Sequence, residues 1–322
     1  MSDLKTLGAG LAALATSLTI AYSSAAVALQ DPQQPTFRSG ASAIAVDVTV
    51  RQDRRAVTGL VASDFQVFDN GVLQQVDDVS YGKLPIDVTV ALDVSHSVSG
   101  NLLDRLRQGV VQLMRDLDRN DRLKLVLFNM RVTRTIDFTN DVDAVERAIR
   151  GVAAGGGTAL LDAVSVTLVS ASIPDRRQLI VFFTDGNDSS STTSFDVLTG
   201  VAQRTRATLT FVMPGAPLVI TRSGSRTSDV TTMPDGSSAA AASAARYAPF
   251  ATLARETGGT ILPVGPATNL TSTFRNILND FRSAYVLYYT ARGVDRAGYH
   301  TIDVKVNRDG AVVEARRGYF GL

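Results

Sequence analysis

The stretch that decides the fold reads IDVTVALDVSHS and covers residues 86–97. Its first seven residues are apolar or β-branched with one exception, which predicts a buried strand. Asp93, Ser95 and Ser97 follow where that strand ends. The next apolar side chains recur at spacings of three and four, which predicts a helix with one apolar stripe. These are Leu103, Leu106, Val110, Leu113 and Leu117.

Strand and helix signals continue to alternate after this first unit. The second predicted strand, 123–128, is joined to the third, 132–138, by a connection too short for a parallel crossover, so the third should run antiparallel. The strand at 178–184 is apolar on both faces, as in a parallel sheet covered on both sides. The sequence therefore predicts an α/β fold with a doubly wound, mostly parallel sheet. Further strands are predicted at 209–213 and 260–262, and helices at 142–149, 159–172, 195–204, 247–256 and 270–281.

The two ends of the chain carry β patterns instead. In 41–82, apolar residues alternate with smaller or polar ones, and Asn70-Gly71 predicts a hairpin. In 284–322, strands are predicted at 285–290, 301–306 and 312–316. Each segment is too short to bury a core alone. We therefore expect a small β module formed from both chain ends, beside an α/β domain at 85–283. Within that domain, 214–245 is rich in Ser, Thr, Gly and Ala and is predicted to be a flexible insertion.

Residues 1–28 have the features of a signal peptide. Lys5 precedes an apolar stretch at 7–22, and Ala26-Val27-Ala28 provides an A-x-A cleavage pattern. The alternative is a leader that is retained as a membrane anchor, although the apolar stretch is shorter than a typical span. Cleavage would give a secreted or periplasmic protein, with no membrane span in the mature chain.

Composition excludes several classes of function. Among 322 residues there is no Cys, so disulfides, thiolate nucleophiles and iron–sulfur clusters are ruled out. Lys and Arg total 32 against 31 for Asp and Glu, a balance that gives no electrostatic reason to expect nucleic acid as a partner. The chain has two His and none of the common hydrolase, zinc-protease or nucleotide-binding motifs.

Polar residues gather where the predicted parallel strands end. Asp93, Ser95 and Ser97 follow one strand, Thr158 opens a helix after three glycines, and Asp185 follows the most apolar strand. If the strands at 86–92 and 178–184 are neighbours where the strand order reverses, these five side chains converge. Carboxylate and hydroxyl oxygens suit a hard cation, Mg²⁺ or also Mn²⁺.

Three motifs carry a resemblance to a known family. The runs DVSHS (93–97), GGGTALLDAV (155–164) and FFTDG (182–186) resemble the metal-ion-dependent adhesion site of von Willebrand factor A domains, with its D-x-S-x-S, Thr and Asp pattern. The resemblance covers 85–283 and implies a Rossmann-like fold. The flanking runs SDFQVFDNG and YVLYYTARG look like those of bacterial exported proteins that contain this domain.

The resemblance also implies roles for individual residues. Ser95 and Ser97 would bind the metal directly, Thr158 directly or through water, and Asp93 and Asp185 mostly through water. Neutral hydroxyls leave the ion most of its charge and an open coordination position, which would capture an Asp or Glu side chain of a protein partner.

The resemblance thus implies a binding module and no enzyme. The alternatives are an envelope or fibre scaffold that the metal only stabilises, and a metal-assisted hydrolase. His96 is expected either to contact the partner at the rim or to face solvent. Asp162 is expected either to support the loop of Thr158 or to be a solvated helix charge, and His300 to have a structural role.

Overall fold

A computed structural model of the chain describes residues 43–53, 55–169, 176–214 and 238–321. The predicted signal peptide and most of the predicted insertion lie outside these residues. Residues Ala41–Leu322 form one compact unit. None of the helices in the described ranges is both long enough and apolar enough to cross a membrane.

Strands predominate towards both ends of the chain, and strands alternate with helices between them. The strands are β1 (Ile44–Gln52), β2 (Arg55–Ala56), β3 (Phe65–Asp69), β4 (Val72–Gln74), β5 (Val76–Tyr81), β6 (Ile86–Asp93), β7 (Arg122–Phe128), β8 (Val132–Thr139), β9 (Arg177–Phe183), β10 (Thr208–Pro214), β11 (Ile261–Val264), β12 (Tyr285–Tyr289), β13 (Gly298–Val306), β14 (Val312–Ala315) and β15 (Gly318–Gly321). The helices are α1 (Asn101–Arg115), α2 (Val142–Ile149), α3 (Leu160–Leu168), α4 (Phe195–Arg204), α5 (Ser238–Glu256) and α6 (Leu270–Arg282), with short 3-10 turns η1 (Ala62–Asp64) and η2 (His96–Val98).

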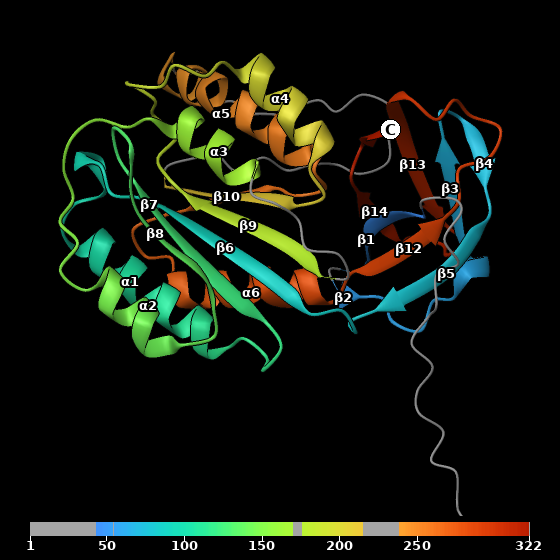
Figure 1. Cartoon of the computed structure of the whole chain (residues 1–322), viewed down its shortest axis with the longest axis horizontal. Helices are drawn as coiled ribbons and strands as arrows, with labels where there is room; N and C mark the ends of the chain where they lie inside the picture. The colour runs from blue at the N-terminus through green and yellow to red at the C-terminus, as the bar shows by residue number, and fades with distance from the viewer. Residues whose placement is uncertain (1–42, 54, 170–175, 215–237, 322) are drawn as a thin grey trace, which may run out of the picture. The chain divides into compact units, whose positions relative to one another are not determined.

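The central sheet has six strands in the order β11-β10-β9-β6-β7-β8. All neighbours are parallel except β7 and β8, which are antiparallel as predicted. The strand order reverses between β6 and β9, which pair directly (Figure 1). The predicted doubly wound α/β fold is confirmed, and its reversal point lies between the two strands that precede Asp93 and Asp185.

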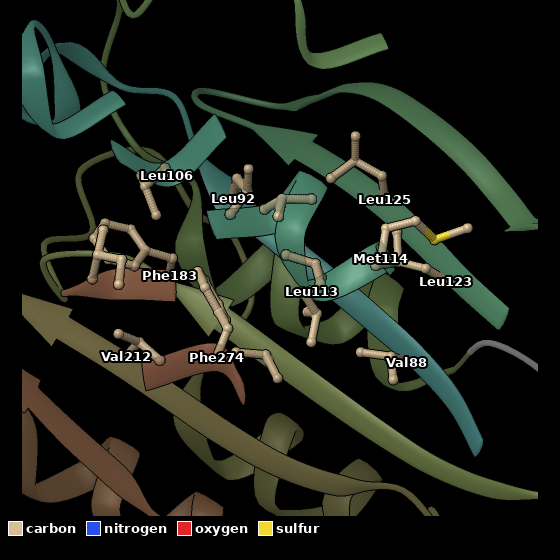
Figure 2. Packing of buried hydrophobic residues seen from close by; sticks show 14 of the residues in the cluster. Val88, Leu92, Leu106, Leu113, Met114, Leu123, Leu125, Phe183, Val212 and Phe274 are labelled. Carbon is tan, nitrogen blue, oxygen red and sulfur yellow. The ribbon is translucent and has the colours of Figure 1, made fainter. Parts of the chain in front are cut away.

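Helices cover both faces of this sheet. In the view of Figure 1, α1, α2 and α6 lie below it and α3, α4 and α5 above it. Successive residues of a strand point to opposite faces of the sheet. In β6, Val90 and Leu92 pack into the cluster with α1, α2 and α6, while Ala91 packs into the cluster with α3, α4 and α5. Figure 2 shows the first cluster, which includes Leu106 and Leu113 of α1 and Phe274 of α6. Burial of two apolar clusters holds the strand ends in a fixed position.

The β module contains strands from both ends of the chain, as predicted. One sheet has the order β14-β1-β12-β5 with β2 attached to β1, and the other has the order β15-β13-β3-β4. The inward side chains form a separate apolar cluster that includes Val48, Val67 and Leu287. Asn70 and Gly71 join β3 to β4 with positive φ angles of 47° and 80°, as a tight hairpin requires.

A buried polar group lies inside this module. Asp69 is fully buried, and its Oδ2 accepts hydrogen bonds from the hydroxyls of Tyr289 (2.9 Å) and Tyr319 (2.8 Å). His300 Nδ1 lies 2.7 Å from Asp69 Oδ1. Burial raises the pKa of both tyrosines, so their hydroxyls remain donors. These contacts join β3, β12, β13 and β15, and they give His300 the structural role expected of it.

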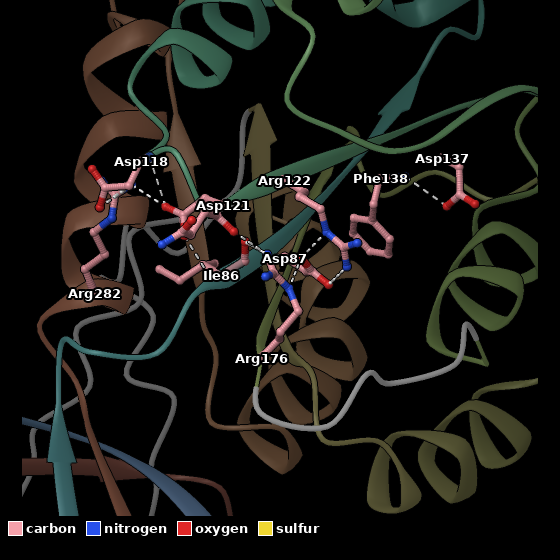
Figure 3. Close-up of polar contacts among 10 residues, drawn as sticks. Ile86, Asp87, Asp118, Asp121, Arg122, Asp137, Phe138, Arg176 and Arg282 are labelled. Atoms are coloured by element: carbon pink, nitrogen blue, oxygen red, sulfur yellow. Dashed lines mark hydrogen bonds and ion pairs between the residues drawn. The ribbon is translucent and has the colours of Figure 1, made fainter. Parts of the chain in front are cut away.

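Ion pairs lie at the amino end of the central sheet, opposite the predicted site. Asp87 is fully buried and is bound by Arg122 (2.6 Å) and Arg176 (2.7 Å). Asp121 accepts a hydrogen bond from the backbone N–H of Ile86 (2.8 Å) and pairs with Arg282 (2.7 Å), as Figure 3 shows. Because each buried carboxylate is matched by a cation, this network anchors the start of β6.

Three sequence predictions differ from the structure. Helix α5 begins at Ser238, inside the range predicted as an insertion, because an alanine-rich run has high helix propensity without any apolar periodicity. Helix α3 ends at Leu168, and 170–172 lie outside the described residues. The last strand, β15, was not predicted, because it is only four residues long and two residues separate it from β14.

Candidate metal centre

The five predicted residues lie on three loops at the carboxyl end of the central sheet. Asp93 is the last residue of β6, and Ser95 and Ser97 follow it before α1. Thr158 lies just before α3, and Asp185 lies two residues after β9. Because β6 and β9 are adjacent parallel strands, Asp93 and the loop of Asp185 leave the sheet side by side.

The first loop is organised around Asp93, which is fully buried. Its Oδ1 accepts a hydrogen bond from the backbone N–H of Ser95 (2.9 Å), and its Oδ2 accepts one from the hydroxyl of Thr184 (2.9 Å). The hydroxyl oxygens of Ser95 and Ser97 lie 3.1 Å apart. Ser95 is buried and Ser97 is exposed, so the pair of hydroxyls extends from the sheet edge to the surface.

The loop before Thr158 is tied to this first loop by backbone hydrogen bonds. His96 N–H donates to the carbonyl of Gly156 (3.1 Å), and Gly155 N–H donates to the carbonyl of Val94 (2.9 Å). Asn129, which follows β7, donates its side-chain amide to Gly155 and accepts at its carbonyl from Ala159. Asn129 is absent from the residues predicted from sequence; its position directly after a strand of the sheet was the available signal.

The third loop holds Asp185 at the surface. Its carboxylate accepts hydrogen bonds from the backbone N–H (3.0 Å) and side-chain amide (2.8 Å) of Asn187. Its carbonyl accepts one from the hydroxyl of Tyr247 in α5 (3.2 Å). Gly186 has a φ of 76°, and a Cβ there would lie 2.9 Å from the Tyr247 ring. A larger residue would thus strain the turn and displace the ring that supports Asp185.

Two further carboxylates fasten the third loop to the start of α3. Asp188 accepts a hydrogen bond from the backbone N–H of Leu161 (2.8 Å), and Asp162 accepts one from that of Thr193 (2.8 Å). Ser189 accepts one from the backbone N–H of Thr158 (3.0 Å). Asp162 therefore supports the loop, which was one of the two roles expected of it, and Asp188 and Ser189 are supports that the sequence did not reveal.

Charge at the centre is negative and poorly compensated. Burial, and to a smaller extent the negative charge of Asp185, raise the pKa of the Asp93 carboxyl, although hydrogen bonds from Ser95 and Thr184 lower it. Within the described part of the chain, neither carboxylate accepts a hydrogen bond from a Lys or Arg side chain. A bound cation would offset the cost of this buried charge.

The donor atoms fit a small hard cation. Adjacent ligands of an octahedral Mg²⁺ ion with bonds of about 2.1 Å are about 3.0 Å apart, close to the separation of the Ser95 and Ser97 hydroxyls. Across the described ranges no group of three or more His, Cys, Asp or Glu side chains is arranged to hold a metal. A metal at this centre would therefore depend on hydroxyl oxygens as well as on the carboxylates of Asp93 and Asp185.

Two exposed side chains flank the centre. His96 lies on the surface between the two serines. Met130 is 59% exposed, and its Cγ lies 3.5 Å from the position that a Cβ on Gly156 would occupy. An imidazole on the first loop and an apolar thioether on the connection between β7 and β8 thus lie beside the polar centre.

Comparison with known proteins gives a match to a family model and to several individual proteins. The family model of the von Willebrand factor type A domain matches residues 88–187. An uncharacterised Synechocystis protein is 28% identical over 110 residues, 33% of this chain and 26% of that protein. Human inter-alpha-trypsin inhibitor heavy chain H4 is 25% identical over 168 residues, 48% of this chain and 17% of that protein. The matches therefore span about a quarter or less of the length of these relatives.

Among solved structures, a von Willebrand factor type A protein from Catenulispora acidiphila has 12% identity and a TM-score of 0.48, and covers 88% of this chain and 75% of that one. The conserved hypothetical protein BatB from Bacteroides thetaiotaomicron has 17% identity and a TM-score of 0.44, and covers 62% of this chain and all of that one. The part of the chain that is similar to the von Willebrand factor type A domain, residues 88–187, contains all five positions of the candidate centre.

Proposed function

We propose that the protein is an exported, non-catalytic module that binds a protein partner through a divalent cation, Mg²⁺ or Mn²⁺. The observation that supports this most is the pair of serine hydroxyls 3.1 Å apart, next to a buried carboxylate that has no cationic partner among the residues that the structure describes. The resemblance of residues 1–28 to a signal peptide supports a secreted or periplasmic location.

Each residue of the centre has a distinct part in this proposal. Ser95, Ser97 and Thr158 would hold the ion through neutral oxygens, while Asp93 and Asp185 would supply negative charge and orient the ligands. When bound, the ion would supply a concentrated positive charge at the protein surface. Because the hydroxyls do not neutralise that charge, it would attract a carboxylate of a partner.

The surroundings of the centre would add selectivity. Met130 offers an exposed apolar contact beside the glycine loop, where an apolar residue next to the partner's carboxylate could pack. His96 would add a favourable contact to an acidic partner when it is protonated. Neither side chain is needed to hold the ion.

Metal binding can be tested by thermal unfolding with and without Mg²⁺. An ion that binds only the folded protein adds about 2.7 kcal/mol at a hundredfold excess over its Kd, which corresponds to a rise in Tm of roughly 5–10 °C. Ser97→Ala and Asp185→Ala should abolish this rise without unfolding the metal-free protein. Ser99→Ala, which removes an exposed hydroxyl two residues away, and His96→Ala should keep it.

Partner binding can be tested by affinity capture from an envelope extract. We expect capture with Mg²⁺, loss of capture with a chelator, and the same loss for Ser97→Ala. Turnover of a phosphate or peptide substrate that requires the metal would contradict the non-catalytic proposal. If neither Mg²⁺ nor Mn²⁺ raises the Tm of the wild type and capture survives the chelator, the proposed metal-dependent function is wrong.

A further inference from the structure

A groove of about 530 Å³ lies in the β module, between β13 and β14. Its volume is within the range of ligand-binding pockets. Four consecutive residues of β13, from Thr301 to Val304, line one wall, and Val313 and Ala315 of β14 line the other. Successive residues of a strand point to opposite faces of the sheet. A groove that touches four in a row therefore runs along the edge of β13 and not over one of its faces.

That edge of β13 is only half paired. Strand β15 pairs with its first part, Gly298–Thr301, and the backbone N–H of Ile302 donates to the carbonyl of Arg317 (2.8 Å). The carbonyl of Thr301 faces the other way, where it accepts a hydrogen bond from Asn70 N–H (2.9 Å). Backbone groups alternate in direction along an antiparallel strand, so those of Val304 and Val306 face the same side as those of Ile302. No described strand pairs with Val304 or Val306 on that side.

The facing edge of β14 is also unpaired. Strand β14 pairs only with β1 among the described strands, in a register that places Val313 opposite Val50. The carbonyl of Val50 accepts a hydrogen bond from Val57 N–H (2.9 Å), on the side of β1 away from β14. Val50 and Val313 thus form a non-hydrogen-bonded pair, and the backbone groups of Val313 and Ala315 face outward. Unpaired backbone donors and acceptors therefore line both walls of the groove.

Two arginines are among the residues that line the groove. Arg316 is 8% exposed, and within the described residues its guanidinium donates to the carbonyls of Gly318 (2.5 Å) and Gln203 (3.4 Å). Arg317 is exposed. The charges of Arg206 and Arg255 also act on this cluster. Burial lowers the pKa of Arg316 most, Asp47 and Tyr299 raise it, and Arg206 lowers it; burial and then Arg317 lower the pKa of Arg255. None of the four arginines forms an ion pair within the described part of the chain.

The nearby acids offset only part of the charge of this cluster, although Glu256 and Asp303 also line the groove. Glu256 accepts a hydrogen bond from the hydroxyl of Tyr299 (2.9 Å), whose pKa is raised to about 12 by burial and by this carboxylate. Asp47 pairs with Arg177 (2.5 Å), and Asp303 is 3.9 Å from Lys305. Asp47 and Asp303 thus lie beside cations of their own, and Glu256 is the one acid of this group without a basic ion-pair partner in the described chain. Against four arginines its charge leaves the cluster net positive, so a ligand with its own carboxylates would be attracted.

From these features we infer that the groove binds an extended acidic peptide, which adds as a strand to the free edge of β13. The backbone groups of Val304 and Val306 would pair with the peptide backbone, the mode of recognition called β-augmentation. Peptide residues placed beside Ile302 and Val304 would continue the inward apolar row, while acidic residues would meet Arg316 and Arg317. The site is separate from the metal centre and does not depend on the proposed function.

The test uses the whole chain in a chelator, so that no metal-bound carboxylate contributes. The probes are a labelled seven-residue peptide of alternating valine and glutamate, the same peptide with lysine for glutamate, and the acidic peptide with alternate backbone nitrogens methylated. Fluorescence anisotropy should show that only the first binds, with an affinity that falls as salt rises. Hydrogen exchange should slow in residues 302–306 when it binds.

The charge of the groove is tested with matched variants. Arg317→Glu should weaken the acidic peptide by about fivefold or more, because it replaces an attraction with a repulsion at a partly exposed site. Arg119→Glu, at an exposed arginine without an ion pair in the described chain, should leave the affinity within a factor of two. Equal binding of all three peptides, or binding without protection of 302–306, would overturn the inference. So would concentration-dependent self-association that protects 302–306, since the edge would then be covered by a second copy.

Discussion

Asp162 is the residue through which helix α3 and the third loop of the metal centre are most directly connected. Its carboxylate accepts hydrogen bonds from the backbone N–H groups of Thr192 (3.1 Å) and Thr193 (2.8 Å). Burial raises the pKa of this carboxyl, but the hydrogen bonds from Thr193 and Thr192 outweigh burial and lower it below its ordinary value of 3.8. The charged form is therefore the one that the folded protein stabilises.

Asp162→Asn should therefore make the free energy of unfolding depend less on pH in the acidic range. A carboxyl whose pKa is lowered by folding contributes stability that is complete above its ordinary pKa and is lost as pH falls through the lower, folded value. At pH 7 we expect the variant to be less stable by about 1 kcal/mol, through weakened hydrogen bonds. The difference in the free energy of unfolding between wild type and variant should become smaller below about pH 4. Urea unfolding at a series of pH values measures this difference.

Asp143→Asn serves as the control, because Asp143 is exposed in the first turn of α2. It should change stability little at any of these pH values. If the free energies of unfolding of wild type and Asp162→Asn differ by the same amount from pH 7 to pH 3, the carboxylate charge does not hold the loop.

The sequence predicted the five residues of the candidate centre but few of those that position them. The motif residues share a recognisable spacing, and strand ends could be placed from the apolar runs. Asp188, by contrast, contacts Leu161, which is 27 positions away, and no local pattern distinguishes it from the other polar residues of its loop. Asn129 could have been suspected only from its place at the end of β7.

At the scale of elements, the packing of α1 against α6 depends on Gly109. A Cβ at this position would lie 2.9 Å from the ring of Phe274, closer than real Cβ contacts allow. The two helices therefore approach over a residue without a side chain. Helix propensity alone would favour alanine here, so packing decides the residue.

Gly109→Ala should destabilise the protein in spite of its higher helix propensity. We expect a loss of about 1–3 kcal/mol in the free energy of unfolding, because the Phe274 ring must shift in a packed cluster. Gly200→Ala in α4 is the matched change, since the nearest atom to its Cβ would be Arg204 Nη1 at 3.5 Å. It should stabilise by about 0.5–1 kcal/mol.

Denaturant unfolding of both variants tests this expectation, and Phe274→Leu in the Gly109→Ala background should recover part of the loss. If Gly109→Ala instead raised the free energy of unfolding, the Phe274 ring would move at no cost.

Elements with a strong apolar period were predicted well, and elements without one were not. The stripe of α1 and the runs of β6 and β9 have the periods of buried elements. The first half of α5 is mostly alanine and serine, a composition shared by helices and flexible segments. β15 is four residues long and exists through its pairing with β13, a long-range contact that local sequence does not encode.

At the scale of the whole molecule, a few polar contacts connect the β module to the α/β domain. Arg177 at the start of β9 pairs with Asp47 of β1 (2.5 Å), donates to the carbonyl of Phe281 (2.6 Å) and stacks on the Phe281 ring at 3.9 Å. The Arg177 side chain is 5% exposed, so this pair is largely shielded from water. The division into domains at 85 and 283 remains a prediction, since Ala41–Leu322 form one compact unit.

Residues 85–283, expressed alone, should fold, because both apolar clusters of the central sheet lie within this range. The fragment should keep the Mg²⁺-dependent rise in Tm and be less stable than the whole chain. Arg177→Gln distinguishes the cause: it should cost about 1–3 kcal/mol more in the whole chain than in the fragment, where Asp47 is absent. Arg150→Gln, which removes an exposed pair with Glu146 that lies within the fragment, should cost the same in both. A fragment that is unfolded at 25 °C while the whole chain is stable would show that the two parts fold only together. Equal costs of Arg177→Gln in fragment and whole chain would show that the pair with Asp47 does not connect them energetically.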